Sequence, residues 1–257
     1  MLKYKGYLID LDGTMYRGSE PIKSARDFVK KLHKNGTPYM FITNNSSRSQ
    51  KDISQKLNHM GVPATQEQVV TSSVAAAMYL KGLNQGASCY LLGEKGLHEA
   101  LEDEGFSITD DDNCDFVVMG IDRHITYEKY AKACLAIRKG AAFIVTNSDT
   151  AIPTERGLLP GNGALSSVIA VSTGVEPIAV GKPEPVIMEA ALSKLGLEKT
   201  DIAMIGDNYH TDIRAGINAG IDTIMVFTGV TREEELPGLE KKPTHHVADL
   251  REWMAFI

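Results

Sequence analysis

Short apolar runs that alternate with loops and helix-forming segments constrain the fold of this 257-residue chain more than any other feature. The runs at 7–9, 39–42, 202–205 and 223–227 consist largely of aliphatic and aromatic residues, a composition typical of buried strands. Strands that alternate with helices at this spacing predict parallel sheets with right-handed crossovers. We therefore expect an α/β fold with a Rossmann-like, doubly wound parallel sheet.

The first helix is expected directly after the opening strand. Ser24 is the candidate N-cap, because a serine hydroxyl can accept a hydrogen bond from a backbone N–H group of the first turn. Gly36 is expected to end the helix, since glycine adopts the left-handed conformation at low cost.

A second series of strands and helices occupies the middle of the chain. Its strands are expected at 89–92, 116–119 and 143–145, and its helices near 96–104, 127–139 and 164–173. This block has enough elements to form a layered α/β unit of its own. We therefore expect a core domain built from residues 1–74 and 177–257, with a smaller α/β domain, residues 75–176, inserted between its two parts.

Composition narrows the functional class. The hydrophobic content of 43% is sufficient for one large core or two smaller ones. A net charge of -6 argues against a nucleic acid polymer as partner, and no apolar stretch approaches the roughly 20 residues that span a membrane. The three cysteines form no Cys-x-x-Cys pair, and the first strand begins too early for a signal peptide. These features predict a cytoplasmic protein.

Polar motifs follow four apolar runs, at 7–9, 39–42, 178–180 and 202–205. They are Asp10-Leu11-Asp12-Gly13-Thr14, Thr43-Asn44-Asn45-Ser46-Ser47, Gly181-Lys182-Pro183, and Gly206-Asp207 with Asp212. Binding crevices of open α/β sheets lie at the carboxyl ends of the strands. We therefore expect the four motifs to meet at one edge of the core sheet.

The first motif indicates a cation site. Asp10 and Asp12 are two residues apart, so a strand end can direct both carboxylates to one spot, where they repel each other unless a cation lies between them. A lone Asp-x-Asp-Gly would favour a simple turn. The convergence of four motifs favours a Mg²⁺ site, with Lys182 and a hydroxyl binding a phosphate. One aspartate could then be a nucleophile and the other a general acid and base.

Taken in order, these motifs resemble those of the haloacid dehalogenase (HAD) superfamily. The stretches Ile42 to Ser46, Val145 to Asp149, Gly181 to Pro185 and Gly206 to Asn208 further resemble its NagD-like branch, which includes para-nitrophenylphosphatases and phosphoglycolate phosphatase. The resemblance covers nearly the whole chain. It implies that the middle block is an α/β cap of the C2 type, which closes over the active site.

The resemblance also implies roles for individual residues. Asp10 would be the nucleophile and a metal ligand. Asp12 would be the general acid and base, would contact substrate, and would bind the metal through its backbone carbonyl. Asp207 would complete the Mg²⁺ ligands, with Asp212 supporting them without binding the ion. Thr43 and Lys182 would bind the phosphoryl oxygens of the substrate with help from Asn44, and Asn208 would also bind substrate.

The expected function is therefore that of a Mg²⁺-dependent phosphatase of small phosphomonoesters, of the nucleotide, sugar phosphate or phosphoglycolate type, acting through an aspartyl-phosphate. An aspartate at position 12 is what the phosphatases and phosphomutases of the family carry, so a phosphomutase is the main alternative. A phospho-switch of the receiver type and a non-catalytic interaction protein are less favoured, because of the motif order and the complete set of polar residues. The expected partner is a small phosphorylated metabolite, with no membrane, and a homodimer through the cap is a further expectation.

Overall fold

The computed structural model describes residues 4–154 and 156–257, and these divide into two compact units. The first unit comprises the chain up to Thr43 together with Gln50–Val70 and Lys182–Ile257. The second comprises Asn44–Ser49 and Thr71–Gly181. Residues 1–3, which the sequence analysis assigned to the core domain, lie outside the described residues.

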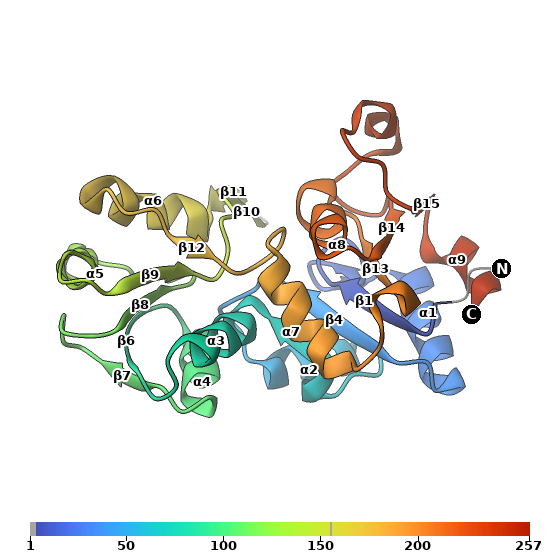
Figure 1. The fold of residues 1–257 in the computed structure, drawn as a ribbon. Coiled ribbons are helices and arrows are strands. Elements are labelled where there is room, and N and C mark those ends of the chain that lie inside the picture. The colour runs from blue at the N-terminus through green and yellow to red at the C-terminus, as the bar shows by residue number, and fades with distance from the viewer. Residues whose placement is uncertain (1–3, 155) are drawn as a thin grey trace. The chain divides into compact units, whose positions relative to one another are not determined.

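A six-stranded sheet forms the centre of the first unit (Figure 1). Its strand order is β15 (His245–Val247), β14 (Asp222–Val226), β13 (Ile202–Gly206), β1 (Gly6–Asp10), β4 (Tyr39–Thr43) and β5 (Val69–Thr71). The pairs from β15 to β4 are parallel. The chain proceeds outward from β1 through β4 and β5, then returns beside β1 and proceeds the other way. The order therefore reverses at β1, which is the topological switch point of a doubly wound sheet.

Helices cover both faces of this sheet. They are α1 (Lys23–Asn35), α2 (Gln50–His59), α7 (Pro185–Leu195), α8 (Arg214–Ala219) and α9 (Leu250–Trp253). Alternate strand residues point to one face, so Tyr7, Ile9 and Phe41 share a buried core with Phe28 of α1 and Trp253 of α9. The α7 helix packs against β4 and α8 on the other face (Figure 1). A small two-stranded sheet, β2 (Tyr16–Arg17) with β3 (Glu20–Pro21), follows β1.

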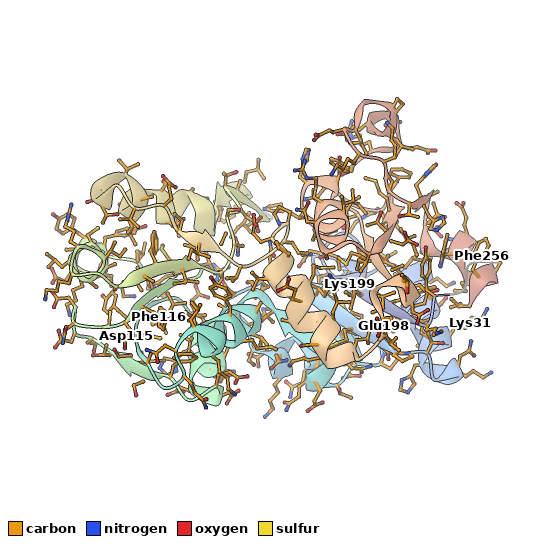
Figure 2. All side chains as sticks on the ribbon, in the orientation of Figure 1. Lys31, Asp115, Phe116, Glu198, Lys199 and Phe256 are labelled. Atoms are coloured by element: carbon orange, nitrogen blue, oxygen red, sulfur yellow. The ribbon has the colours of Figure 1, made fainter. Side chains whose placement is uncertain are left out.

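The start of α1 differs from the sequence-based expectation. Its first residue is Lys23, and Ile22, which precedes it, provides no side-chain cap. Ser24 instead lies inside the first turn and is buried, so its prediction as the N-cap was wrong. Gly36 ends the helix with φ of 68°, as expected. The C-terminal turn is attached to α1. The Lys31 ammonium of α1 donates to the Met254 carbonyl at 2.8 Å, and Figure 2 shows Lys31 near the turn that carries Phe256.

The second unit contains a five-stranded parallel sheet. Its strand order is β12 (Ile178–Ala179), β9 (Ala142–Val145), β8 (Phe116–Met119), β6 (Ser88–Leu92) and β7 (Ser107–Thr109). Helices α3 (Ser72–Leu83), α4 (Lys95–Asp103), α5 (Tyr127–Arg138) and α6 (Asn162–Thr173) accompany it, with a hairpin of β10 (Ala151–Thr154) and β11 (Gly157–Pro160). Figure 2 labels Asp115 and Phe116, where β8 begins. The α/β fold class with parallel sheets is thus confirmed.

Four strands of the second unit were not expected there. The short strand β7 and the hairpin β10–β11 have no strong apolar alternation. The strand β12 pairs with β9 in the second unit's sheet, whereas residues 177–257 were all expected in the core domain. The role of the second unit as a cap stays a prediction. No helix within 4–154 and 156–257 combines the length and the apolar character that crossing a bilayer requires.

Candidate active site

Three buried carboxylates meet in the first unit. Asp10 is the last residue of β1, Asp207 directly follows β13, and Asp212 lies in a π-helical turn, Tyr209–Ile213. Each of the three offers an oxygen within 4.8 Å of the others' oxygens. Their exposed fractions are only 6%, 0% and 1%. Since β1 and β13 are parallel neighbours, the sheet itself brings the first two together at its carboxyl edge.

Lys182 joins this group from the loop before α7. Its ammonium donates to Asp10 Oδ1 at 2.5 Å and to Asp212 Oδ1 at 2.7 Å, and it lies 3.5 Å from the carbonyl oxygen of Ile42. The lysine is 97% buried, so both ion pairs are shielded from solvent. Three carboxylates and one ammonium carry an excess of two negative charges when all are ionised. Burying two negative charges that no positive charge compensates lowers the stability of the fold.

Burial and the neighbouring charges shift the pKa values of Asp10, Asp207 and Lys182. Burial raises the pKa of Asp10 well above its ordinary value, and the neighbouring Asp212 carboxylate adds to the shift, while Lys182 opposes it. Burial, with Asp212, also raises the pKa of Asp207 to about 6. Burial alone would lower the pKa of Lys182, but Asp10 and Asp212 raise it above its ordinary value. The lysine therefore stays a cation, whereas Asp10 and Asp207 take up a proton more readily than exposed carboxyl groups do.

The donor set fits a divalent cation of the Mg²⁺ type. Mg²⁺ prefers hard oxygen ligands, and Asp10, Asp207 and Asp212 offer carboxylate oxygens at close range. Its two positive charges would offset the excess that Lys182 leaves. The buried oxygens of these carboxylates are thus compatible with Mg²⁺, and Mg²⁺ as the cofactor stays a prediction.

Glycines allow these side chains to approach the backbone. Gly13 has φ of 93°, a conformation that glycine adopts readily, and a Cβ atom built there would overlap the Asp207 carboxylate. A Cβ atom on Gly206 would overlap the side chain of Asp212. The two glycines of the first and fourth motifs therefore leave the space that the carboxylates occupy.

Asp12 lies in a different environment from Asp10. It is exposed, and the Tyr16 hydroxyl donates to its Oδ2 at 3.5 Å. The Lys56 ammonium of α2 lies 3.5 Å from the centre of the Tyr16 ring. Two aspartates only two residues apart thus occupy a wet and a dry environment, which is an arrangement that separates a proton-exchanging group from a nucleophile.

The remaining predicted residues of the first unit lie beside this group. Thr43 is buried at the end of β4. The Asn208 side-chain oxygen accepts from the backbone N–H of His210, and the backbone N–H of Asn208 donates to Asp212 Oδ2 at 3.0 Å. Asn208 therefore shapes the turn that presents Asp212. Asp212 is one of the three carboxylates whose oxygens lie within 4.8 Å of one another, and its expected role of supporting the metal ligands without binding the ion stays a prediction.

Asn44 is described with the second unit. Its side-chain amide donates to both carboxylate oxygens of Asp149, at 3.4 and 3.2 Å, and its carbonyl accepts from the Asn147 amide at 2.9 Å. Asn162, at the start of α6, in turn donates to the Asn147 carbonyl at 3.0 Å. These residues form a polar cluster that connects two loops of this unit with the start of α6. Sequence spacing gave no indication of the pairing between Asn44 and Asp149.

Two contacts to Asp207 were not predicted from the sequence. The Thr14 hydroxyl donates to Asp207 Oδ1 at 2.8 Å, and the backbone N–H of Val230 donates to Oδ2 at 2.7 Å. Thr14 belongs to the first motif, so its hydroxyl was visible in the sequence but not assigned to Asp207. Val230 follows the apolar run 223–227, and the rule that polar function follows strand ends would have singled out this loop.

The chain resembles known proteins over its full length. Residues 7–107 match a family model described as haloacid dehalogenase-like hydrolase, and residues 179–253 match a second, described as HAD-hydrolase-like. The chain is 55% identical to the 5′-nucleotidase YutF of Bacillus subtilis, with 100% of both chains covered. It is 52% identical to the acid sugar phosphatase of Staphylococcus haemolyticus, over 97% of this chain and 95% of that protein.

Solved structures show the same similarity. A double mutant of the thermostable NPPase from Geobacillus stearothermophilus superposes with a TM-score of 0.94 at 51% identity, covering 100% of both chains. The p-nitrophenyl phosphatase from Archaeoglobus fulgidus also gives a TM-score of 0.94, at 34% identity, over 99% of this chain and 100% of that one.

Proposed function

The chain belongs to the haloacid dehalogenase-like hydrolases, and from this premise we propose that it is a Mg²⁺-dependent phosphatase of small phosphomonoesters that works through a phosphorylated Asp10. The relatives named 5′-nucleotidase and acid sugar phosphatase support a phosphomonoester substrate. The observation that carries the proposal is the buried group in which Lys182 bridges Asp10 and Asp212 beside Asp207. It combines a nucleophile, a fixed cation and oxygen ligands for a metal.

Asp10 and Asp207 would hold Mg²⁺, with Asp212 adjacent and the Asp12 backbone carbonyl as a further ligand, and the bound ion would neutralise charge on the phosphoryl oxygens. Lys182 supplies a second positive charge from the protein side. Because it is held by two carboxylates, its ammonium is already positioned before substrate arrives. Preorganised charge of this kind lowers the barrier without reorganisation during the reaction.

The reaction proceeds in two steps at Asp10. In the first, a carboxylate oxygen of Asp10 attacks phosphorus, the bond from phosphorus to the ester oxygen breaks, and that oxygen takes a proton from Asp12. In the second, Asp12 removes a proton from a water molecule, which attacks the phosphorus of the acyl phosphate. The bond to Asp10 breaks, phosphate is released, and both aspartates return to their starting states. The exposure of Asp12 gives water access to its carboxylate for the second step.

The proposal is tested by phosphate release from a panel of phosphomonoesters. The panel contains a 5′-nucleotide, a sugar phosphate, phosphoglycolate and p-nitrophenyl phosphate, each assayed with Mg²⁺ and with EDTA. We expect release that depends on Mg²⁺ from at least one compound. Isomerised sugar phosphate without free phosphate would indicate a phosphomutase instead. Folded protein that releases no phosphate from any compound would contradict the proposal.

Mg²⁺ binding is expected to weaken below pH 6. In the metal-free protein the pKa of Asp207 is raised to about 6, so at pH 5 the ion must displace a proton that is largely absent at pH 7. One such proton makes binding about tenfold weaker at pH 5 than at pH 7. Isothermal titration calorimetry at the two pH values measures this difference. Asp207→Asn is expected to bind weakly at both, and equal affinity of the wild type at pH 5 and 7 would contradict the assignment.

The raised pKa of Asp207 should also make the stability of the metal-free protein depend on pH. A carboxyl group whose pKa is higher in the folded protein stabilises the fold below its unfolded pKa, and this contribution is lost as the pH rises through the folded value. For Asp207 the rise from 3.8 to about 6 corresponds to about 3 kcal/mol. In EDTA the protein should therefore lose stability between about pH 4 and 6. Mg²⁺ should raise the melting temperature more at pH 7 than at pH 5.

A further inference from the structure

The loop after β14, residues 228–231 with the sequence Thr-Gly-Val-Thr, contacts Asp207 on two sides of the residue. The backbone N–H of Val230 donates to Asp207 Oδ2 at 2.7 Å, and that of Thr231 donates to the Asp207 carbonyl at 3.2 Å. Asp207 Oδ1 accepts from Thr14. Each oxygen of this carboxylate therefore has a donor, and one of the donors comes from the 228–231 loop.

Two glycines enclose the same carboxylate. A Cβ atom on Gly229 would overlap Asp207 Oδ2 and would lie 2.9 Å from the Cα atom of Gly13. A Cβ atom on Gly13 would overlap the carboxylate as well. The Asp207 carboxylate thus occupies a slot between two backbone segments, and the slot has room only because neither segment carries a side chain at that point.

Hydroxyl groups fix the 228–231 loop to the loops on either side. The Thr228 hydroxyl donates to the Gly13 carbonyl at 2.7 Å, and the Thr228 carbonyl accepts from Arg17 at 2.7 Å. The Thr231 hydroxyl accepts from the backbone N–H of Tyr209 at 2.9 Å. The loop is therefore bonded to the segment that follows Asp10 and to the turn that carries Asp212.

From these contacts we infer that the 228–231 loop is a positioning element, with Gly229 as its decisive residue, that sets the orientation of the Asp207 carboxylate for metal binding. In this role the loop acts on the metal through Asp207. The inference rests on the proposed function, because Asp207 has a metal to bind only if Mg²⁺ is the cofactor. The orientation itself can be examined without metal.

Gly229→Ala provides the direct test, with Gly238→Ala as its matched control, because a Cβ atom at Gly238 meets nothing within 4 Å. We expect Gly229→Ala to bind Mg²⁺ at least tenfold more weakly than Gly238→Ala by calorimetry in the absence of substrate. The Mg²⁺ concentration for half-maximal activity should rise in parallel, while turnover at saturating Mg²⁺ changes less. An affinity within threefold of the control would overturn the inference.

Thr228 provides the second test, which serves even if Gly229→Ala does not fold. Thr228→Val keeps the shape of the side chain but removes the donor to the Gly13 carbonyl, whereas Thr228→Ser keeps the donor. We expect a Mg²⁺ affinity more than threefold weaker in the valine variant and restored in the serine variant. Equal affinity of all three proteins would count against a positioning role.

A crystal structure of Gly229→Ala grown in EDTA, or of Thr228→Val if the alanine variant does not fold, separates this inference from the proposed function. We expect the Asp207 carboxylate to move and its 2.8 Å hydrogen bond from Thr14 to be lost or lengthened. If the wild type binds no Mg²⁺, the proposed function fails, but the position of Asp207 in the variant still decides whether the loop orients it. An unmoved carboxylate would overturn the inference even if the wild type is a Mg²⁺ phosphatase.

Discussion

Replacement of Asp10 by Asn should reduce turnover by at least about 10⁴-fold, because loss of a covalent nucleophile typically costs this much or more. The amide has nearly the same shape but does not attack phosphorus, and it is a poorer ligand for Mg²⁺. Phosphate release at saturating Mg²⁺ and substrate measures the loss. Acid quenching with labelled substrate should trap a phosphoryl group on the wild type and none on the variant. Turnover within tenfold of the wild type would rule out Asp10 as nucleophile.

The same variant should remain folded. In the metal-free protein Asp10 is a buried carboxyl whose pKa is raised by burial and by Asp212, so its charge opposes folding at neutral pH. Lys182 keeps its ion pair with Asp212 when Asp10 is replaced. The melting temperature in EDTA at pH 7 should therefore equal or exceed that of the wild type. Asp201→Asn is the control, since it makes the same chemical change in an exposed ion pair and should retain full activity.

Much of the first unit follows from its apolar runs. The strands at Gly6–Asp10, Tyr39–Thr43 and Ile202–Gly206 were expected from buried apolar sequence, and parallel pairing brings their carboxyl ends together. For this reason the sequence placed Asp10 and Asp207 in one region, with Asp212 close behind, and the structure brings oxygens of the three carboxylates within 4.8 Å of one another. Lys182 also reaches this group, although the strand before it, β12, pairs in the sheet of the second unit. Residues that directly follow parallel strands can be placed from the sequence because the ends of these strands lie at the same edge of the sheet.

Contacts made by backbone groups could not be read in the same way. The N–H group of Val230 contacts Asp207, but any residue has such a group, and only the loop conformation directs this one to the carboxylate. Likewise, Gly229 matters through the side chain it lacks. The pairing of Asn44 with Asp149 joins residues 105 positions apart and depends on how the second unit packs. The helix start at Lys23 shows that a suitable capping residue does not by itself decide where a helix begins.

Replacement of Lys182 by Met should lower the free energy of unfolding more than any of the other substitutions proposed above. The lysine is buried and bonded to Asp10 and Asp212, so its removal leaves two buried carboxylates without their cation. Breaking a buried ion pair in this way costs about 3–5 kcal/mol. Chemical denaturation in EDTA at pH 7 measures the loss. Lys5→Met is the control, because Lys5 forms an exposed pair with Asp201 at 2.8 Å and such pairs contribute about 0–1 kcal/mol.

Two further results would show that unbalanced charge, and not lost packing, causes this effect. Mg²⁺ should recover part of the stability of Lys182→Met, since the ion supplies positive charge to the same carboxylates. Adding Asp10→Asn to Lys182→Met should also recover stability, because it removes one of the uncompensated charges. Two neighbouring substitutions would then be less harmful together than their sum, which is the signature of direct coupling. A double variant destabilised by the full sum would contradict the charge explanation. Activity should not recover in either case, because the phosphoryl group would still lack the ammonium of Lys182.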